Sequence, residues 1–256
     1  MNRPLVVAAL SWIAVCVVWA PRQAPASPRP QILADANAAA SDVARMRTAA
    51  EQGDATAQYN LGRAYFAGQG IQRDYAEALK WFRRAADQGL AAAQYSLGEM
   101  YGGVPPGENE RQYRAIVEVD GLEAFLWYVK AAEQGHADAQ FKVGVLYYSG
   151  SSDDRGLTNV KRSADQAAVW FRRAADQGDE RAMRFLGSMY ADGVGVRRDD
   201  IEAYKWEYLA DLRGPRRPYD DLRGKLAKRM TRQQIAGAER RALEWLDAFE
   251  KAQKNN

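Results

Sequence analysis

The stretch WFRRAADQG occupies residues 81–89, and the same nine residues recur at 170–178. Its last six residues, RAADQG, also occur in related forms elsewhere in the chain. The four copies are TAAEQG at 48–53, RAADQG at 84–89, KAAEQG at 130–135 and RAADQG at 173–178. A second motif, LGxxY or VGxxY, follows each form, at residues 61–65, 97–101, 143–147 and 186–190. The glycines of both motifs repeat at the same intervals of 36, 46 and 43 residues. Two motifs that share one irregular spacing indicate tandem structural units.

Each unit is predicted to contain two helices. The first, the A helix, runs through the glycine–tyrosine motif, and the second, the B helix, ends at the glycine of the opening motif because glycine readily follows a helix C-terminus. A capping-box spacing precedes every B helix. These pairs are Asp74–Glu77, Asp120–Glu123, Ser163–Gln166 and Asp199–Glu202. The units are predicted at about 54–89, 90–135, 136–178 and 179–214. The fold class is therefore all-α, an α-solenoid of antiparallel helix pairs.

The flanking segments complete this organisation. Residues 37–53 read as a capping helix after a linker at 27–36. Residues 215–256 read as a C-terminal helical cap, with a short helix near 219–229. The second and third units are longer because their A–B loops, 102–120 and 149–163, carry insertions. Insertions of this kind either form a binding face or are tolerated as surface loops without a role.

The first 26 residues have the pattern of a secretory signal peptide. Arg3 precedes a run at 5–20 that is apolar except for Ser11, and Ala24 and Ala26 form an A-x-A site. Cleavage is expected after Ala26, which would make the protein periplasmic or secreted. Cleavage after Ala36 and an uncleaved membrane anchor at residues 5–20 are the alternatives.

The remaining chain offers little chemistry beyond packing. Cys16, the only cysteine, lies in the leader, so thiol chemistry and disulfides are not expected. The net charge of +3 falls to near +1 when Arg3 and Arg22 leave with the leader, which does not favour nucleic-acid binding. The only histidine, His136, is expected to be exposed because Leu90 occupies the equivalent position. No catalytic residues, metal site or cofactor are predicted.

Residues 57–89, AQYNLGRAYFAGQGIQRDYAEALKWFRRAADQG, resemble the Sel-one-like repeat, a relative of the tetratricopeptide repeat. The resemblance extends over about residues 37–212. It implies a right-handed superhelix and an adaptor role, and exported bacterial members include envelope-signalling regulators and exopolysaccharide-machinery components. Cysteine-rich members have been linked to penicillin binding and β-lactamase activity, but this chain lacks those cysteines.

Positions of the A helices that differ between units are the candidate binding residues, because packing does not dictate them. They are Asn60, Ser96 and Lys142 in one row, Arg63 and Glu99 in another, and Arg184, which replaces an aromatic residue. A mixed polar groove suits a peptide or a protein helix. The sequence thus favours a non-catalytic protein-interaction scaffold or regulator of the bacterial cell envelope, with ligands in its concave groove. An envelope glycan or exopolysaccharide-pathway binding protein and a cell-wall or β-lactam hydrolase are the alternatives.

Overall fold

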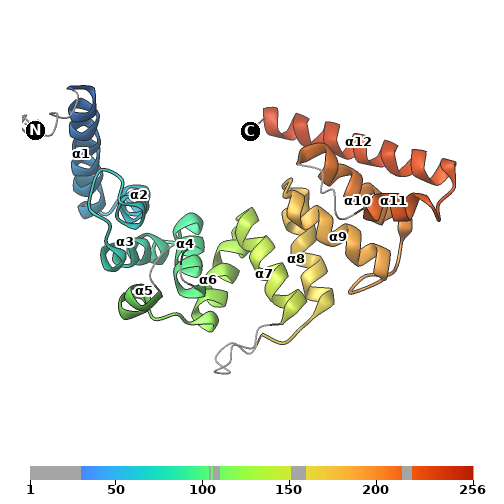
Figure 1. Cartoon of the computed structure of the whole chain (residues 1–256), viewed down its shortest axis with the longest axis horizontal. Coiled ribbons are helices and arrows are strands. Elements are labelled where there is room, and N and C mark those ends of the chain that lie inside the picture. The colour runs from blue at the N-terminus through green and yellow to red at the C-terminus, as the bar shows by residue number, and fades with distance from the viewer. Residues whose placement is uncertain (1–29, 104, 106–109, 151–159, 215–220, 256) are drawn as a thin grey trace, which may run out of the picture.

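The computed structural model describes residues 30–103, 105, 110–150, 160–214 and 221–255. Over this part of the chain the structure is built from helices and contains no strand, which confirms the all-α prediction. The helix pairs follow one another along an arc, with α1 at one end and α12 at the other (Figure 1). This arrangement is the expected α-solenoid.

The helices pair in chain order. The four pairs are α2 (Ala55–Ala67) with α3 (Tyr75–Asp87), α4 (Ala91–Gly102) with α6 (Gly121–Glu133), α7 (Ala137–Ser149) with α8 (Ala164–Asp176), and α9 (Glu180–Asp192) with α10 (Asp200–Arg213). The helices outside these pairs are α1 (Pro30–Glu51), α5 (Glu110–Ile116), α11 (Leu222–Ala227) and α12 (Arg232–Lys254). In each pair the A helix comes first and the B helix second.

The B helices begin where the sequence predicted. Asp74 illustrates the pattern, since its side chain accepts hydrogen bonds from the backbone N–H groups of Ala76 and Glu77. The reciprocal half of the predicted capping box is absent from α3, and that part of the prediction is wrong. Glu77 instead accepts a hydrogen bond of 3.0 Å from the indole Nε1 of Trp81, one turn further along α3. Among the described helices, only α12 has a complete capping box.

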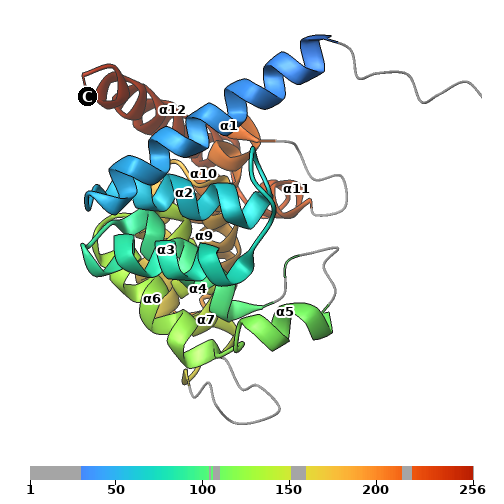
Figure 2. The same cartoon turned by 90° about the vertical axis from the view of Figure 1, so that its left-hand side faces the viewer.

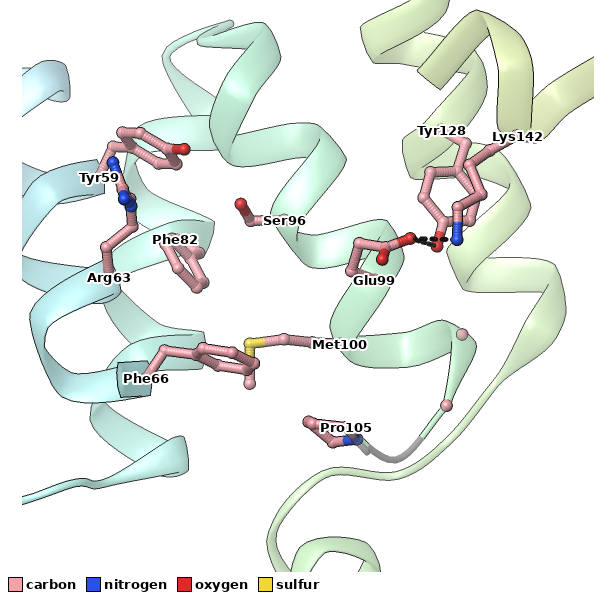
Figure 3. A pocket seen from close by; sticks show the side chains of 12 residues that line it. Tyr59, Arg63, Phe66, Phe82, Ser96, Glu99, Met100, Pro105, Tyr128 and Lys142 are labelled. Carbon is pink, nitrogen blue, oxygen red and sulfur yellow. Dashed lines mark hydrogen bonds and ion pairs between the residues drawn. The ribbon is translucent and has the colours of Figure 1, made fainter. Parts of the chain in front are cut away.

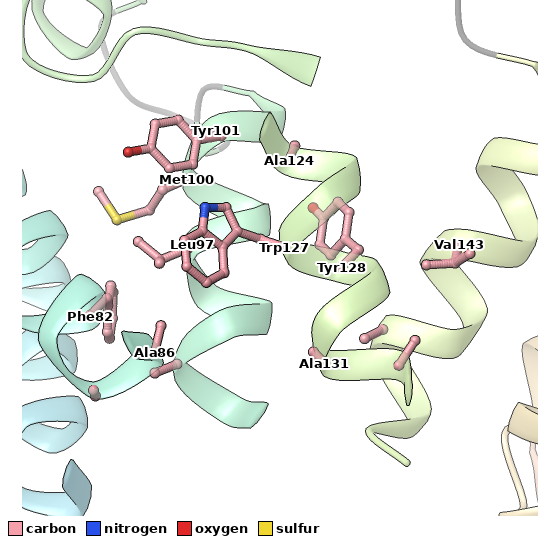
Figure 4. Packing of buried hydrophobic residues seen from close by; sticks show 14 of the residues in the cluster. Phe82, Ala86, Leu97, Met100, Tyr101, Ala124, Trp127, Tyr128, Ala131 and Val143 are labelled. Carbon is pink, nitrogen blue, oxygen red and sulfur yellow. The ribbon is translucent and has the colours of Figure 1, made fainter. Parts of the chain in front are cut away.

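Each of the first three pairs packs a B-helix aromatic ring onto a glycine of its A helix. A Cβ built on Gly98 would lie 2.5 Å from the ring of Tyr128, and Gly62 and Gly144 are covered in the same way. Figure 4 shows Tyr128 and Trp127 packed among buried residues of α4 and α6. Glycine therefore allows a close helix–helix approach, and the ring above it belongs to the residue that follows Trp81, Trp127 or Trp170.

Hydrogen bonds made by glutamine side chains join consecutive helix pairs. Gln94 on α4 is buried, and its side chain donates to the carbonyl of Ala86 near the end of α3. Its own carbonyl accepts a 2.7 Å hydrogen bond from Gln134 at the end of α6. The same arrangement occurs at Gln58 with Gln88 and at Gln140 with Gln177. The glutamine of the WFRRAADQG motif is thus an inter-helix connector as well as part of a helix end.

The fourth pair replaces aromatic contacts with charge. In the first three pairs two rings face each other across the pair, as Tyr59 and Phe82 do at 5.8 Å between centroids. In the fourth, Arg184 and Glu207 occupy the corresponding positions and form an ion pair at 3.5 Å. Arg184 also contacts Asp211 at 3.2 Å, and Asp211 in turn pairs with Arg223 of α11. This cluster ties the last pair to the C-terminal cap.

The insertion in the second unit is not simply a surface loop. It contains α5, in which Tyr113 is only 1% exposed and donates a 2.9 Å hydrogen bond to the carbonyl of Met100. The Tyr113 ring also packs edge-on against Tyr75 at the start of α3, with centroids 5.0 Å apart. The insertion therefore bridges the first and second pairs. Most of the third unit's insertion lies outside the described residues.

The two ends differ in part from expectation. Helix α1 begins at Pro30, so residues 30–36, expected to form a linker, are helical, and Figure 2 shows α1 lying across α2. Helix α11 is shorter than the predicted helix near 219–229. Helix α12 packs on α10.

No described helix is both long and apolar enough to cross a membrane. The expected signal peptide, with Cys16 and Ala26, lies outside the described residues.

Candidate binding site

A pocket of about 500 Å³ lies between α2 and α4, with further walls from α3, α6 and α7. It joins a polar side to an apolar side (Figure 3). Its lining is formed by Tyr59, Arg63, Phe66, Phe82, Ser96, Glu99, Met100, Gly102, Gly103, Pro105, Tyr128 and Lys142. Pockets that hold small molecules or peptide side chains commonly have this size and mixed character.

Four of the six candidate binding residues line this pocket: Arg63, Ser96, Glu99 and Lys142. Asn60 lines a second hollow of about 290 Å³ between α1 and α2, and Arg63 lines both. The two hollows are therefore adjacent, with Arg63 between them. Arg184 lies elsewhere, in the ion-pair cluster of the fourth pair, where its side chain is only 13% exposed. We therefore leave Arg184 out of the site.

Glu99 is held by two partners on one side of the pocket. Its carboxylate accepts a 2.5 Å hydrogen bond from the Tyr128 hydroxyl, and the Lys142 ammonium lies 2.9 Å from the same oxygen. Burial and the neighbouring Glu99 carboxylate raise the pKa of Tyr128, so this hydroxyl stays a donor at neutral pH. This arrangement compensates the negative charge of Glu99 within the pocket wall.

Arg63 is arranged differently. Its guanidinium lies 5.8 Å from the centre of the Tyr59 ring, a cation–π distance. Within the described part of the chain it has neither an ion-pair nor a hydrogen-bond partner, and it is exposed. Among the described residues, no acid balances this positive charge of the pocket.

The apolar side was not predicted from the sequence. Phe66, Phe82 and Met100 meet there, and Pro105 lies at its edge (Figure 3). One sequence signal could have indicated this side: Pro105 lies in the insertion that interrupts the second unit.

His136 is not the exposed residue that the sequence suggested. It is the N-cap of α7, where its Nδ1 accepts a hydrogen bond from the backbone N–H of Ala139. Its ring stacks on Tyr95, with centroids 4.7 Å apart. Burial lowers its pKa, which favours the neutral form that can accept this bond. The described residues contain no cluster of acidic, histidine or cysteine side chains that could hold a metal ion.

Comparison with protein-family models gives a match to the Sel1 repeat over residues 55–90, 91–136, 137–179 and 180–209, more than half of the sequence. The chain belongs to the Sel1 repeat family. The resemblance stated from residues 57–89 is therefore confirmed. Sel1 repeats generally serve as protein–protein interaction scaffolds.

Solved structures of Sel1 repeat proteins are similar to this chain. A Sel1 repeat protein from Oxalobacter formigenes is 30% identical with a TM-score of 0.61, over 75% of this chain and 49% of its own. This chain thus spans about half of that protein. The protective antigen c5321 of uropathogenic Escherichia coli is 22% identical with a TM-score of 0.38, over 85% of this chain and 60% of its own. The immunity protein Pa5087 of Pseudomonas aeruginosa is 20% identical with a TM-score of 0.42, over 86% of this chain and 84% of its own. No curated protein matches the chain.

Proposed function

We propose that this Sel1 repeat protein is a non-catalytic scaffold or regulator of the bacterial cell envelope. It binds a segment of a partner protein in the groove formed by α2, α4 and α7. The observation that supports this most is the pocket of about 500 Å³ on three A helices, because its apolar side and its polar side are adjacent. A peptide segment presents both kinds of group at short spacing.

The groove fits an extended segment better than a compact ligand. The second hollow, between α1 and α2, continues it past Arg63, so the two hollows offer consecutive places for side chains. Solenoid repeats generate extended binding surfaces of this kind by stacking. The envelope location rests on the signal-peptide pattern at residues 1–26.

Site-specific crosslinking tests this function. A photoreactive amino acid would replace Ser96 inside the pocket, and in a matched variant it would replace Leu243, which is 49% exposed on α12. The full chain would be expressed in its own bacterium and irradiated in intact cells. We expect one defined protein adduct at position 96 that is absent at position 243.

Other outcomes would contradict the proposal. Retention of the purified chain on peptidoglycan or exopolysaccharide, without a protein adduct at position 96, would favour the glycan-binding alternative. Turnover of nitrocefin or muropeptides by the purified chain would contradict its non-catalytic role and favour the hydrolase alternative. Mass measurement of the N-terminus in cells would distinguish cleavage after Ala26 from anchoring by residues 5–20.

A further inference from the structure

We propose that the groove selects a partner segment in which an acidic side chain neighbours a bulky apolar side chain. The carboxylate would bind Arg63 and Ser96, and the apolar side chain would fill the space beside Phe66, Met100 and Pro105. This inference rests on the proposed function and adds the chemistry that the groove recognises.

The acids near Arg63 are already paired with other cations. The acid in the pocket, Glu99, is already compensated by Lys142 at 2.9 Å. The acid lining the adjacent hollow, Asp42, forms an ion pair with Arg45. Arg63 lies between these two pairs and has no acidic partner among the described residues. A guanidinium binds a carboxylate through parallel N–H donors, so the missing partner is best supplied by a carboxylate.

Hydrogen-bond donors on the same side support an anion. Ser96 is half-buried in the pocket, and its hydroxyl has no hydrogen-bond partner within the described chain. The Tyr59 hydroxyl likewise lacks one there. Figure 3 shows Tyr59 and Arg63 on one wall and Ser96 between that wall and Glu99. These two hydroxyls can donate to an anion held by Arg63, whose guanidinium is a donor only. Among the described lining residues the acid, Glu99, is already paired with Lys142 and Tyr128 through Oε1. A carboxylate at Arg63 would therefore find further donors beside it.

The apolar side defines the neighbouring group. Met100 is only 1% exposed and Phe82 is 3% exposed, so they form the floor, and Phe66 and Pro105 form the rim. Gly102 also lines the pocket, but a Cβ built on it would face the Tyr128 hydroxyl and Ala124 of α6 and not these apolar side chains. An aromatic or long aliphatic side chain would be removed from water here, at roughly 25 cal/mol for each Å² buried. The carboxylate and the apolar group must therefore lie close together in the ligand.

An internal acidic residue fits better than a chain end. The hollow between α1 and α2 continues the groove on the far side of Arg63. A segment that ended at Arg63 would leave this hollow unused. Residues two apart in an extended segment point to the same face. We therefore expect the acid and the apolar residue to lie within two positions of each other.

A peptide library provides the test. Random nine-residue segments would be displayed between inert flanks, so that neither end is free, and selected on the immobilised full chain. Selection would be repeated on Arg63→Gln and on the control Arg240→Gln, which alters an exposed arginine of α12. We expect Asp or Glu within two positions of Phe, Tyr, Trp, Leu or Met after selection on wild type and Arg240→Gln, but not on Arg63→Gln.

Fluorescence anisotropy would then measure one enriched peptide with acetylated and amidated ends. Replacing its acid with the corresponding amide, or using Arg63→Gln, should each weaken binding about ten-fold, as expected for a charge-assisted bond that is partly exposed to water. The two changes together should weaken binding little more than either alone. Ser96→Ala should weaken it by a smaller factor. Circular dichroism would verify that each variant is folded.

Several results would overturn the inference. They are enrichment that does not change in Arg63→Gln, equal binding of the acidic and amide peptides, or binding that requires a free C-terminal carboxylate. If any of these occurs while the adduct at position 96 persists, the selectivity is wrong and the proposed function stands. If the adduct is also missing, both are wrong.

Discussion

The ion pair in the fourth helix pair predicts an unusual double-variant result. Arg184 and Glu207 stand where Tyr59 and Phe82 face each other in the first pair. The slot is the same, because Glu207 lies over Gly187 as Phe82 lies over Gly62. Restoring the aromatic pair by Arg184→Tyr and Glu207→Phe together should therefore be tolerated far better than Arg184→Tyr alone.

The expected changes in the free energy of unfolding follow from the burial of these side chains. Arg184→Tyr alone removes the guanidinium that lies 3.5 Å from the Glu207 carboxylate, which is 7% exposed, and breaking such a buried pair costs about 3–5 kcal/mol. Asp211 is less affected because Arg223 still lies 3.2 Å from it. Glu207→Phe alone should cost less, since Arg184 keeps Asp211. Replacing both partners with well-packed apolar groups is often nearly neutral, so the double variant should lie within about 1.5 kcal/mol of wild type.

Thermal unfolding followed by far-ultraviolet circular dichroism provides the measurement. At about 2–4 °C for each kcal/mol in a chain of this size, Arg184→Tyr should lower Tm by roughly 10 °C, and the second change should recover most of this loss. The double-mutant cycle should give a coupling of at least about 2 kcal/mol. The reasoning is refuted if the double variant is as unstable as Arg184→Tyr, or if Arg184→Tyr unfolds at the wild-type temperature.

Three further results are expected. Gly98→Ala should lower Tm, because overpacking against Tyr128 costs about 1–3 kcal/mol and outweighs a gain of about 1 kcal/mol in helix propensity; an unchanged or higher Tm would contradict the close approach. Tyr113→Phe should cost about 1 kcal/mol in urea unfolding by removing the bond to the Met100 carbonyl. Burial lowers the pKa of His136 below 6.5, so the unfolded chain binds more protons and stability should fall as the pH falls below that value. His136→Asn, which keeps an N-cap acceptor, should remove this part of the pH dependence, and an unchanged profile would contradict it.

The fold could be predicted from the sequence because it repeats. Asp74 caps a helix start by accepting hydrogen bonds from nearby backbone N–H groups. Gly89, with φ 88°, allows the left-handed conformation that follows a helix end. Both effects are local, so a short motif specifies each helix end. The partners of these side chains could not be predicted equally well. Glu77 has the right spacing for a reciprocal cap, but Trp81 one turn later offers it a competing donor.

The pocket was predictable only in part. Comparison of equivalent A-helix positions selected Arg63 and Glu99, which line it, because residues that packing does not dictate vary between units. The same comparison misplaced Arg184, since a charged residue in an aromatic slot can be balanced by a change on the partner helix. Here that change is Glu207, on the B helix, which the comparison did not include. The apolar side includes Pro105, which lies in an insertion that interrupts the repeat pattern.

The contact between Tyr113 and Tyr75 has a mechanical consequence. In a stack of repeats each unit touches only its neighbours, so bending is concentrated at the junctions between units. Helix α5 adds a second attachment across the junction between the first two pairs. The pocket between α2 and α4 spans this same junction. A stiffened junction would keep the pocket walls at a fixed separation before any ligand arrives, so less freedom would be lost on binding. Most of the bending would then occur at the later junctions, between the second and third pairs and between the third and fourth.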